Sequence, residues 1–201
     1  MRCCFTLVIV TALAVFLAGL ARSPTPRNAA GSPRHEDGDI VTGALRVDAP
    51  TLPSGWVVER TQSPINDAAN VSVMIGSAQR VPGKLGGSIH LQLALRCREG
   101  KPSLAVNFGD HFMVSAKYFD WGKVTYRVDR MTAVEQRWVH SSDNAELMLE
   151  GPPAVALMRK LNSARTFLVR AVPFGEAPLT ATFDIRGLET ASVPLRSACG
   201  W

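Results

Sequence analysis

An alternation of apolar and polar residues with a period of two recurs through the C-terminal part of the chain. It is clearest at residues 88–97, SIHLQLALRC. The apolar positions of this segment are Ile89, Leu91, Leu93, Leu95 and Cys97. Because successive side chains of a β-strand point to opposite faces, the pattern predicts a half-buried strand with Cys97 on its inner face.

Several other short segments show the same alternation. They are residues 103–108, 123–129 and 179–187, with 70–76 and 165–172 as further candidates. Turn signals such as REGKP, DWGK and PFGEAP separate them. Many short alternating strands divided by turns are typical of antiparallel sheets packed face to face or closed on themselves. The sequence therefore predicts an all-β fold, either an antiparallel β-sandwich or an open barrel.

Two segments depart from this period and predict one or two short covering α-helices. Residues 151–164 place apolar side chains at helical spacing, after two prolines and before basic residues. These side chains are Ala154, Leu157, Met158 and Leu161. Residues 187–201 carry a similar stripe, which Pro194 is expected to kink or split.

The start of the chain has the order of a secretory signal peptide. Arg2 precedes the apolar run FTLVIVTALAVFLAGL, and the segment GLA that ends at Ala21 supplies the small residues that a signal peptidase needs. Residues 1–21 are thus interpreted as a signal peptide, with an uncleaved membrane anchor as the alternative. Residues 22–53 are polar and rich in Pro and Gly, which predicts a flexible linker. Residues 54–201 are expected to form a single domain.

Two cysteines, Cys97 and Cys199, remain after removal of the signal peptide. In an oxidising compartment a lone pair of cysteines is most simply a disulfide. Closing a loop of roughly a hundred residues would contribute about 4–5 kcal/mol by chain-entropy reasoning. Two buried free thiols are the alternative interpretation.

The formal net charge of +5 is modest and contains no run of Lys or Arg. Nucleic-acid binding usually requires a concentrated basic stripe or a recognisable module, so it is not expected. A solvated surface explains the charge best, and contact with anionic cell-wall polymers or lipid headgroups is the alternative.

One candidate binding face can be drawn on the predicted strands. Arg127 and Asp129 lie on the polar side of segment 123–129, and Trp138 follows on the next expected strand. An ordinary solvated strand face is the alternative, since a surface ion pair stabilises by only about 0–1 kcal/mol.

No catalytic residue, metal site or cofactor is predicted. Asp110 and His111 sit at an expected turn, where an aspartate that caps its neighbours is the better interpretation. His140, Ser141 and Asp143 contain the residue types of a hydrolase triad, but triad members normally converge from separate segments. The histidines show no metal-ligand spacing.

The order of the motifs resembles a known family. The motifs are SPINDAANVSVMIGS, LQLALRC, VTYRVD, RWVHSSDN, TFLVRAVPF, TATFDIRGL and a terminal LRSACGW. In this order they resemble the VasI/TagO family of type VI secretion system-associated proteins, over residues 54–201. The resemblance implies an exported accessory protein without established reaction chemistry or cofactor.

The resulting expectation is a periplasmic or secreted protein that acts by binding, not by catalysis. Its expected partners are an envelope protein of a secretion machine or peptidoglycan, with membrane contact only through an uncleaved signal segment. Two alternatives stay open. One is a peptidoglycan-acting hydrolase, and the other is a periplasmic inhibitor or small-ligand carrier.

Overall fold

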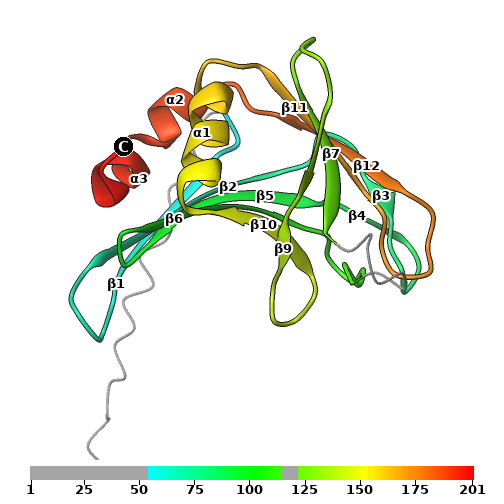
Figure 1. Ribbon diagram of the computed structural model, residues 1–201, viewed down its shortest axis with the longest axis horizontal. Coiled ribbons are helices and arrows are strands. Elements are labelled where there is room, and N and C mark those ends of the chain that lie inside the picture. Colours follow the sequence, from blue (N-terminus) through cyan, green and yellow to red (C-terminus); the bar gives the residue numbers. More distant parts are fainter. Residues whose placement is uncertain (1–53, 115–121) are drawn as a thin grey trace, which may run out of the picture. The chain divides into compact units, whose positions relative to one another are not determined.

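The computed structural model describes residues 54–114 and 122–201. These residues form a six-stranded sheet, a four-stranded sheet, a two-stranded sheet and three short helices (Figure 1). All strand pairs in them are antiparallel. The prediction of an all-β fold with short helices is confirmed. The predicted signal peptide (1–21) and linker (22–53) lie outside the described residues.

The spatial order of the strands differs from their order in the chain. The six-stranded sheet runs β1 (Val57–Gln62), β2 (Ala69–Gly76), β5 (Gln92–Arg98), β6 (Lys101–Asn107), β10 (Glu146–Glu150) and β9 (Val139–His140). The four-stranded sheet runs β12 (Leu179–Asp184), β11 (Thr166–Ala171), β7 (Lys123–Val128) and β8 (Val134–Arg137). The two-stranded sheet pairs β3 (Val81–Pro82) with β4 (Ser88–Ile89).

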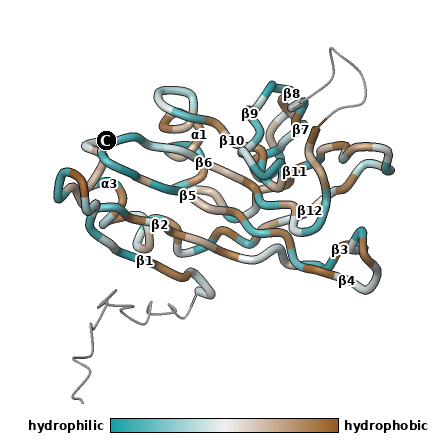
Figure 2. Tube along the Cα trace, turned by 90° about the horizontal axis from the view of Figure 1, so that it is seen from below, coloured by the Kyte–Doolittle hydropathy of each residue, from teal (hydrophilic) through white to brown (hydrophobic). Residues whose placement is uncertain are grey.

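The alternation in the sequence determines which side chains enter the core. Hydropathy changes along the strands (Figure 2), and the apolar positions of both larger sheets belong to one buried cluster. On β5, Leu93, Leu95 and Cys97 are fully buried. On the opposite face of the same sheet, Ala94 and Ala105 are also fully buried, which the alternation does not predict.

The predicted strand 88–97 is interrupted between β4 and β5. Ser77 bonds to the chain at this point: its N–H donates to the Leu91 carbonyl oxygen at 2.8 Å, and its hydroxyl accepts from the Leu91 N–H at 3.1 Å. The Ser77 carbonyl oxygen lies 2.8 Å from His90 Nδ1. These bonds occupy groups that a continuous ladder would use, so β4 pairs with β3 and β5 pairs with β2 and β6.

Helix α1 (Gly151–Asn162) begins where predicted, ends two residues before the predicted end at 164, and has the predicted apolar face. Its buried residues are Ala154, Leu157, Met158 and Leu161. The helix packs against β6 and β10 of the six-stranded sheet and contacts α2. Among the described residues, no helix is both long enough and apolar enough to span a membrane.

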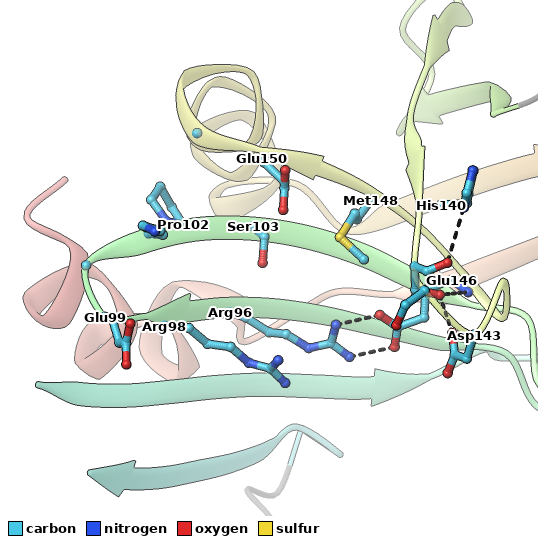
Figure 3. A pocket seen from close by; sticks show the side chains of 15 residues that line it. Arg96, Arg98, Glu99, Pro102, Ser103, His140, Asp143, Glu146, Met148 and Glu150 are labelled. Carbon is cyan, nitrogen blue, oxygen red and sulfur yellow. Dashed lines mark hydrogen bonds and ion pairs between the residues drawn. The ribbon is translucent and has the colours of Figure 1, made fainter. Parts of the chain in front are cut away.

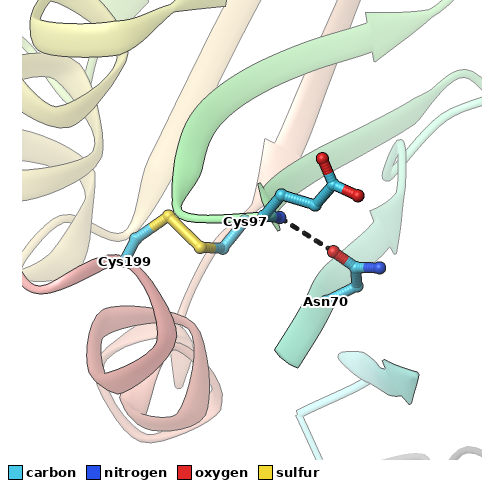
Figure 4. Close-up of a disulfide and its surroundings, with 4 residues drawn as sticks. Asn70, Cys97 and Cys199 are labelled. Atoms are coloured by element: carbon cyan, nitrogen blue, oxygen red, sulfur yellow. Dashed lines mark hydrogen bonds between the residues drawn. A yellow bond between two sulfur atoms is a disulfide. The ribbon is translucent and has the colours of Figure 1, made fainter. Parts of the chain in front are cut away.

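The end of the chain is held against the six-stranded sheet by a disulfide. The stripe at 187–201 forms α2 (Leu188–Ala191) and α3 (Val193–Cys199), with Pro194 in the first turn of α3, so the predicted split is confirmed. Cys199 of α3 is bonded to Cys97 of β5, with 5.8 Å between the Cα atoms (Figure 4). Helix α3 contacts β2 and β5, and Trp201 packs half-buried against the core.

Candidate functional site

A concave surface lined mainly by polar residues lies on the outer face of the six-stranded sheet (Figure 3). The hollow above it has a volume of about 970 Å³. Its floor is formed by residues of β5, β6 and β10. The β5–β6 turn borders it at one end, and the β9–β10 turn borders it at the other. We call this feature the concave surface. The floor side chains are Arg96, Ser103, Glu146 and Met148.

Strand register explains why these side chains share one face. Arg96 of β5 is directly opposite Ser103 of β6, which is opposite Glu150 of β10. Glu146 is four residues before Glu150 on β10 and lies opposite Asn107. The Arg96 side chain therefore extends along the sheet to reach Glu146. It crosses the row that holds Ala94 and Ala105, where small side chains leave room for it.

Arg96 and Glu146 form a two-pronged ion pair on the floor. Arg96 Nη1 donates to Glu146 Oε2 at 2.6 Å, and Nη2 donates to Oε1 at 2.7 Å. Asn107 Nδ2 donates to the same Oε1 at 3.2 Å. The two charged side chains are only 14% and 12% exposed. Such planar paired hydrogen bonds are among the strongest between side chains, and this pair joins β5 to β10 across β6.

The ion pair keeps both groups charged. Hydrogen bonding to Glu146 raises the pKa of the Arg96 guanidinium. The same hydrogen bonds from Arg96 lower the pKa of the Glu146 carboxyl, against the opposing effect of its burial. Glu146 is thus a carboxylate at neutral pH and accepts hydrogen bonds.

The HSSD segment at the edge of the concave surface is a turn. The Ser141 hydroxyl donates to Asp143 and accepts from the Glu146 N–H at 3.0 Å. Asp143 also accepts from the Ala145 N–H at 3.1 Å, and hydrogen bonding from Ser141 lowers the pKa of its carboxyl. His140 Nδ1 lies 3.2 Å from the Ser141 carbonyl oxygen. These bonds connect residues within one hairpin turn.

Charges of both signs surround the floor. Arg98 and Lys101 are exposed beside the β5–β6 turn, and Glu150 is exposed at the start of α1. Glu99, between the two cations, accepts from the Ser63 hydroxyl at 2.6 Å, so it is tied to the sheet. The surface thus presents charged groups of both signs to the solvent.

The structure does not bring Arg127, Asp129 and Trp138 together as a surface. Trp138 is 2% exposed and packs against Tyr126, with 6.2 Å between the ring centroids. It follows β8 directly, where the chain passes from the four-stranded sheet to β9 of the six-stranded sheet, and its indole enters the core. The prediction that Trp138 belongs to an exposed face is wrong.

The other two residues of that prediction have separate roles. Asp129 accepts from the Arg165 N–H at 3.0 Å and from the Thr166 N–H at 2.8 Å, and these bonds lower the pKa of its carboxyl. It therefore holds the start of β11. Arg127 is exposed on the outer face of the four-stranded sheet, opposite Leu168.

Asp110 and His111 join three loops. Asp110 Oδ2 accepts from the Leu85 N–H at 2.8 Å, 25 residues away in the sequence, so this bond joins a distant loop and is not the predicted cap of neighbouring turn residues. His111 is 3% exposed; its Nδ1 lies 2.7 Å from Glu176 Oε2, and its Nε2 lies 2.9 Å from the Pro82 carbonyl oxygen. The partners are 65 and 29 residues away, and no sequence pattern indicates them.

Sequence reasoning also missed the ion pair on the floor. The alternation placed Arg96 on the polar face of its strand, but no sequence signal linked it to Glu146, which is 50 residues away.

Residues 50–201 match a family model described as Type VI secretion system VasI, EvfG. Among solved structures, the chain is similar to the crystal structure of invasion associated protein B from Bartonella henselae. The identity is 12%, the match covers 73% of this chain and 94% of that chain, and the TM-score is 0.45. No curated protein matches the chain.

Proposed function

Because the chain belongs to the VasI family of type VI secretion system proteins, we propose that it is an exported accessory protein that binds an envelope component of the secretion machine. It would do so through the concave surface, without catalysis. The floor formed by the Arg96–Glu146 ion pair carries this proposal.

Two features support export. The first 21 residues have the composition of a signal peptide. Cys97 and Cys199 form a disulfide, and such bonds persist in oxidising compartments such as the bacterial periplasm.

The geometry of the concave surface supports binding. Its floor lies on adjacent antiparallel strands and is braced by the Arg96–Glu146 pair, so a partner would meet a preformed surface. The exposed charges at its edge, Arg98, Lys101 and Glu150, have no ion pair or hydrogen bond from their side chains among the described residues. A peptide segment with charges of both signs matches this arrangement.

Two of the four acidic side chains that line the surface are poorly suited to act as a general acid. A general acid needs a carboxyl whose pKa is raised, as in glycoside hydrolases. Glu146 and Asp143 have lowered pKa values, because Arg96 and Ser141 donate hydrogen bonds to them. Both carboxylates also hold local structure, so they are committed to partners within the chain.

The proposal can be tested by cross-linking and affinity capture in the bacterium that makes the protein. Three chains would be compared: the natural one, Arg98→Gln with Lys101→Gln, and a control with Arg159→Gln and Lys160→Gln. The control removes the same charge from exposed positions on the last turns of α1. A secretion-machine protein captured by the natural chain and the control, but reduced at least tenfold with the first variant, is the expected result.

Two outcomes would overturn the proposal. One is equal capture by all three chains, since the concave surface would then play no part. The other is release of soluble fragments from purified cell-wall sacculi incubated with the protein, which would show a hydrolase. Retention on intact sacculi, without capture of a protein, would identify peptidoglycan as the partner instead.

A further inference from the structure

The buried imidazole of His111 connects three loops that are distant in the sequence. His111 is 3% exposed and lies in the loop that follows β6. Its Nδ1 is 2.7 Å from Oε2 of Glu176, which lies in the β11–β12 loop. Its Nε2 is 2.9 Å from the carbonyl oxygen of Pro82, the last residue before the β3–β4 loop. We call His111, Glu176 and the Pro82 carbonyl group the His111 junction.

Both ring nitrogens of His111 face hydrogen-bond acceptors. A carbonyl oxygen has no proton to donate, and an ionised carboxylate can only accept. A neutral imidazole carries a single N–H, so it would bond to one of these oxygens and direct a nitrogen lone pair at the other. The imidazolium form carries two N–H groups and can donate to both. The geometry of the junction therefore fits the protonated ring.

The charges around the ring agree with this protonation state. Asp110 Oδ1 is buried without a hydrogen bond and lies 3.7 Å from His111 Nε2. Hydrogen bonding from the Leu85 N–H lowers the pKa of the Asp110 carboxyl, so this group is ionised. Lys84 Nζ lies 3.6 Å from Glu176 Oε1. Two carboxylates thus face two cations when the ring is charged. Placing the second proton on Glu176 instead would leave Asp110 facing a neutral ring.

Other charged side chains lie close to Glu176 but do not take part in the junction. Lys123, Glu135 and Arg170 line a hollow of about 410 Å³ together with Glu176. Lys123 Nζ is 3.1 Å from Glu135 Oε1, and Arg170 Nε donates to the Thr180 hydroxyl at 3.0 Å. Within the described part of the chain, none of these three has an ion pair or a hydrogen bond to the junction. The charged groups that face the ring are thus the three named above.

The three connected loops carry exposed apolar side chains. Leu85 is 88% exposed, Phe112 is 49% exposed and Phe174 is 48% exposed. The Phe174 N–H donates to the Phe112 carbonyl oxygen at 2.7 Å, and Lys84 Nζ lies 4.5 Å above the Phe112 ring. These contacts join the loops in pairs, whereas the His111 side chain bonds to both of the other loops at once. The junction therefore fixes how the three apolar groups lie relative to one another.

We propose that His111 is a pH-sensitive clamp that holds these three loops together only while both of its ring nitrogens carry protons. Loss of one proton leaves a nitrogen lone pair 2.7 or 2.9 Å from an oxygen atom. That contact is repulsive, so the loops separate. Histidine is suited to such a switch because a solvated imidazole changes its charge near pH 6.5.

The direction of the pH dependence follows from the count of protons. Above about pH 6.5 the ring of an open, solvated junction has lost its second proton, while the closed junction retains it. The closed form therefore binds one proton more, and its stability relative to the open form falls as pH rises. One proton corresponds to a change of up to about tenfold in the opening equilibrium for each pH unit.

Hydrogen exchange of the natural protein between about pH 5.5 and about pH 8.5 tests the clamp. After correction for the intrinsic pH dependence of exchange, protection in residues 83–87 and 172–178 is expected to fall by up to about tenfold per pH unit. Protection of β5 should stay constant, because the domain remains folded. His111→Gln should remove the pH dependence from both loops.

His90→Gln is the matched control. His90 is exposed, and its Nδ1 lies 2.8 Å from the Ser77 carbonyl oxygen. Its other ring nitrogen has no bond among the described residues, so a neutral ring satisfies this site. The control should therefore keep the pH dependence of the natural chain.

Nitrogen-15 NMR of the histidine rings tests the clamp without any substitution. Both ring nitrogens of His111 should carry protons wherever the loops are protected, and one proton should be lost at the pH at which protection falls.

Four results would overturn the inference. They are loop protection that does not change with pH, a parallel loss of protection in β5, loss of the pH dependence in His90→Gln, and an unprotonated ring nitrogen of His111 while the loops are still protected. None of the residues of the junction lines the concave surface, so these results leave the proposed function untouched.

Discussion

Arg96 and Glu146 are 50 residues apart in the sequence, yet two nitrogens of the one lie 2.6 and 2.7 Å from two oxygens of the other. The pair crosses a complete strand, β6, and forms the floor of the concave surface. It is therefore both a structural connection and the centre of the candidate site.

Replacing Arg96 with Met is expected to lower the free energy of unfolding by about 1–3 kcal/mol, because the Glu146 carboxylate would lose its donors in a largely buried position. Adding Glu146→Leu to this variant should recover much of the loss, because no unpaired charge then remains. Urea unfolding of the two single variants and the double variant measures this. Additive losses in the double variant would show that the two side chains are not coupled.

The ion pair should also make stability depend on pH. The folded-state pKa of Glu146 is lowered from its ordinary value of 4.5, so its contribution is present above that value and is lost as pH falls through the folded pKa. The difference in unfolding free energy between the natural chain and Glu146→Gln should be constant near neutral pH and shrink below about pH 4.5. A difference that stays constant down to acid pH would contradict this.

Removing the disulfide is expected to lower the free energy of unfolding by about 2–5 kcal/mol, because the bond spans 102 residues and restricts the unfolded chain. The comparison is between the natural chain and Cys97→Ala with Cys199→Ala, by urea unfolding with and without a reductant. The reductant should destabilise only the natural chain. Equal midpoints for all four samples would show that the bond does not stabilise the domain.

Replacing His111 with Ala should lower the free energy of unfolding by about 1–3 kcal/mol, since buried polar partners lose their hydrogen bonds. Hydrogen exchange should also accelerate in the loops at residues 83–87 and 172–178, which His111 joins through Pro82 and Glu176. Glu176→Gln retains an oxygen that can accept from Nδ1, so its loss should be smaller. Unchanged exchange in both loops would contradict the proposed connection.

Asp129 is expected to matter for stability and not for partner binding. Asp129→Ala should cost about 1–2 kcal/mol, because the N–H groups of Arg165 and Thr166 lose their acceptor and the backbone has a φ of 47°. Asp129→Asn keeps an acceptor and tolerates this φ, so it should be close to neutral. Both variants should still capture the partner of the natural chain. Loss of capture with Asp129→Asn would show that Asp129 belongs to a binding face after all.

Local pattern and tertiary structure determined different parts of this protein. The period of two on β5 and β7, and the helical spacing on α1, follow from backbone geometry, so the sequence alone predicted these elements and their buried faces. The chemistry of the two cysteines outside the predicted signal segment was likewise enough to predict the Cys97–Cys199 bond.

The pairing of distant strands was decided only by the tertiary structure. It buried Trp138 where the chain changes sheets, and it aligned Arg96 with Glu146 and Lys123 with Arg137. A periodic pattern specifies which face of a strand is apolar, but it does not specify which strand lies beside it or in which register. Long-range packing sets that choice, and the polar surfaces of this domain are its result.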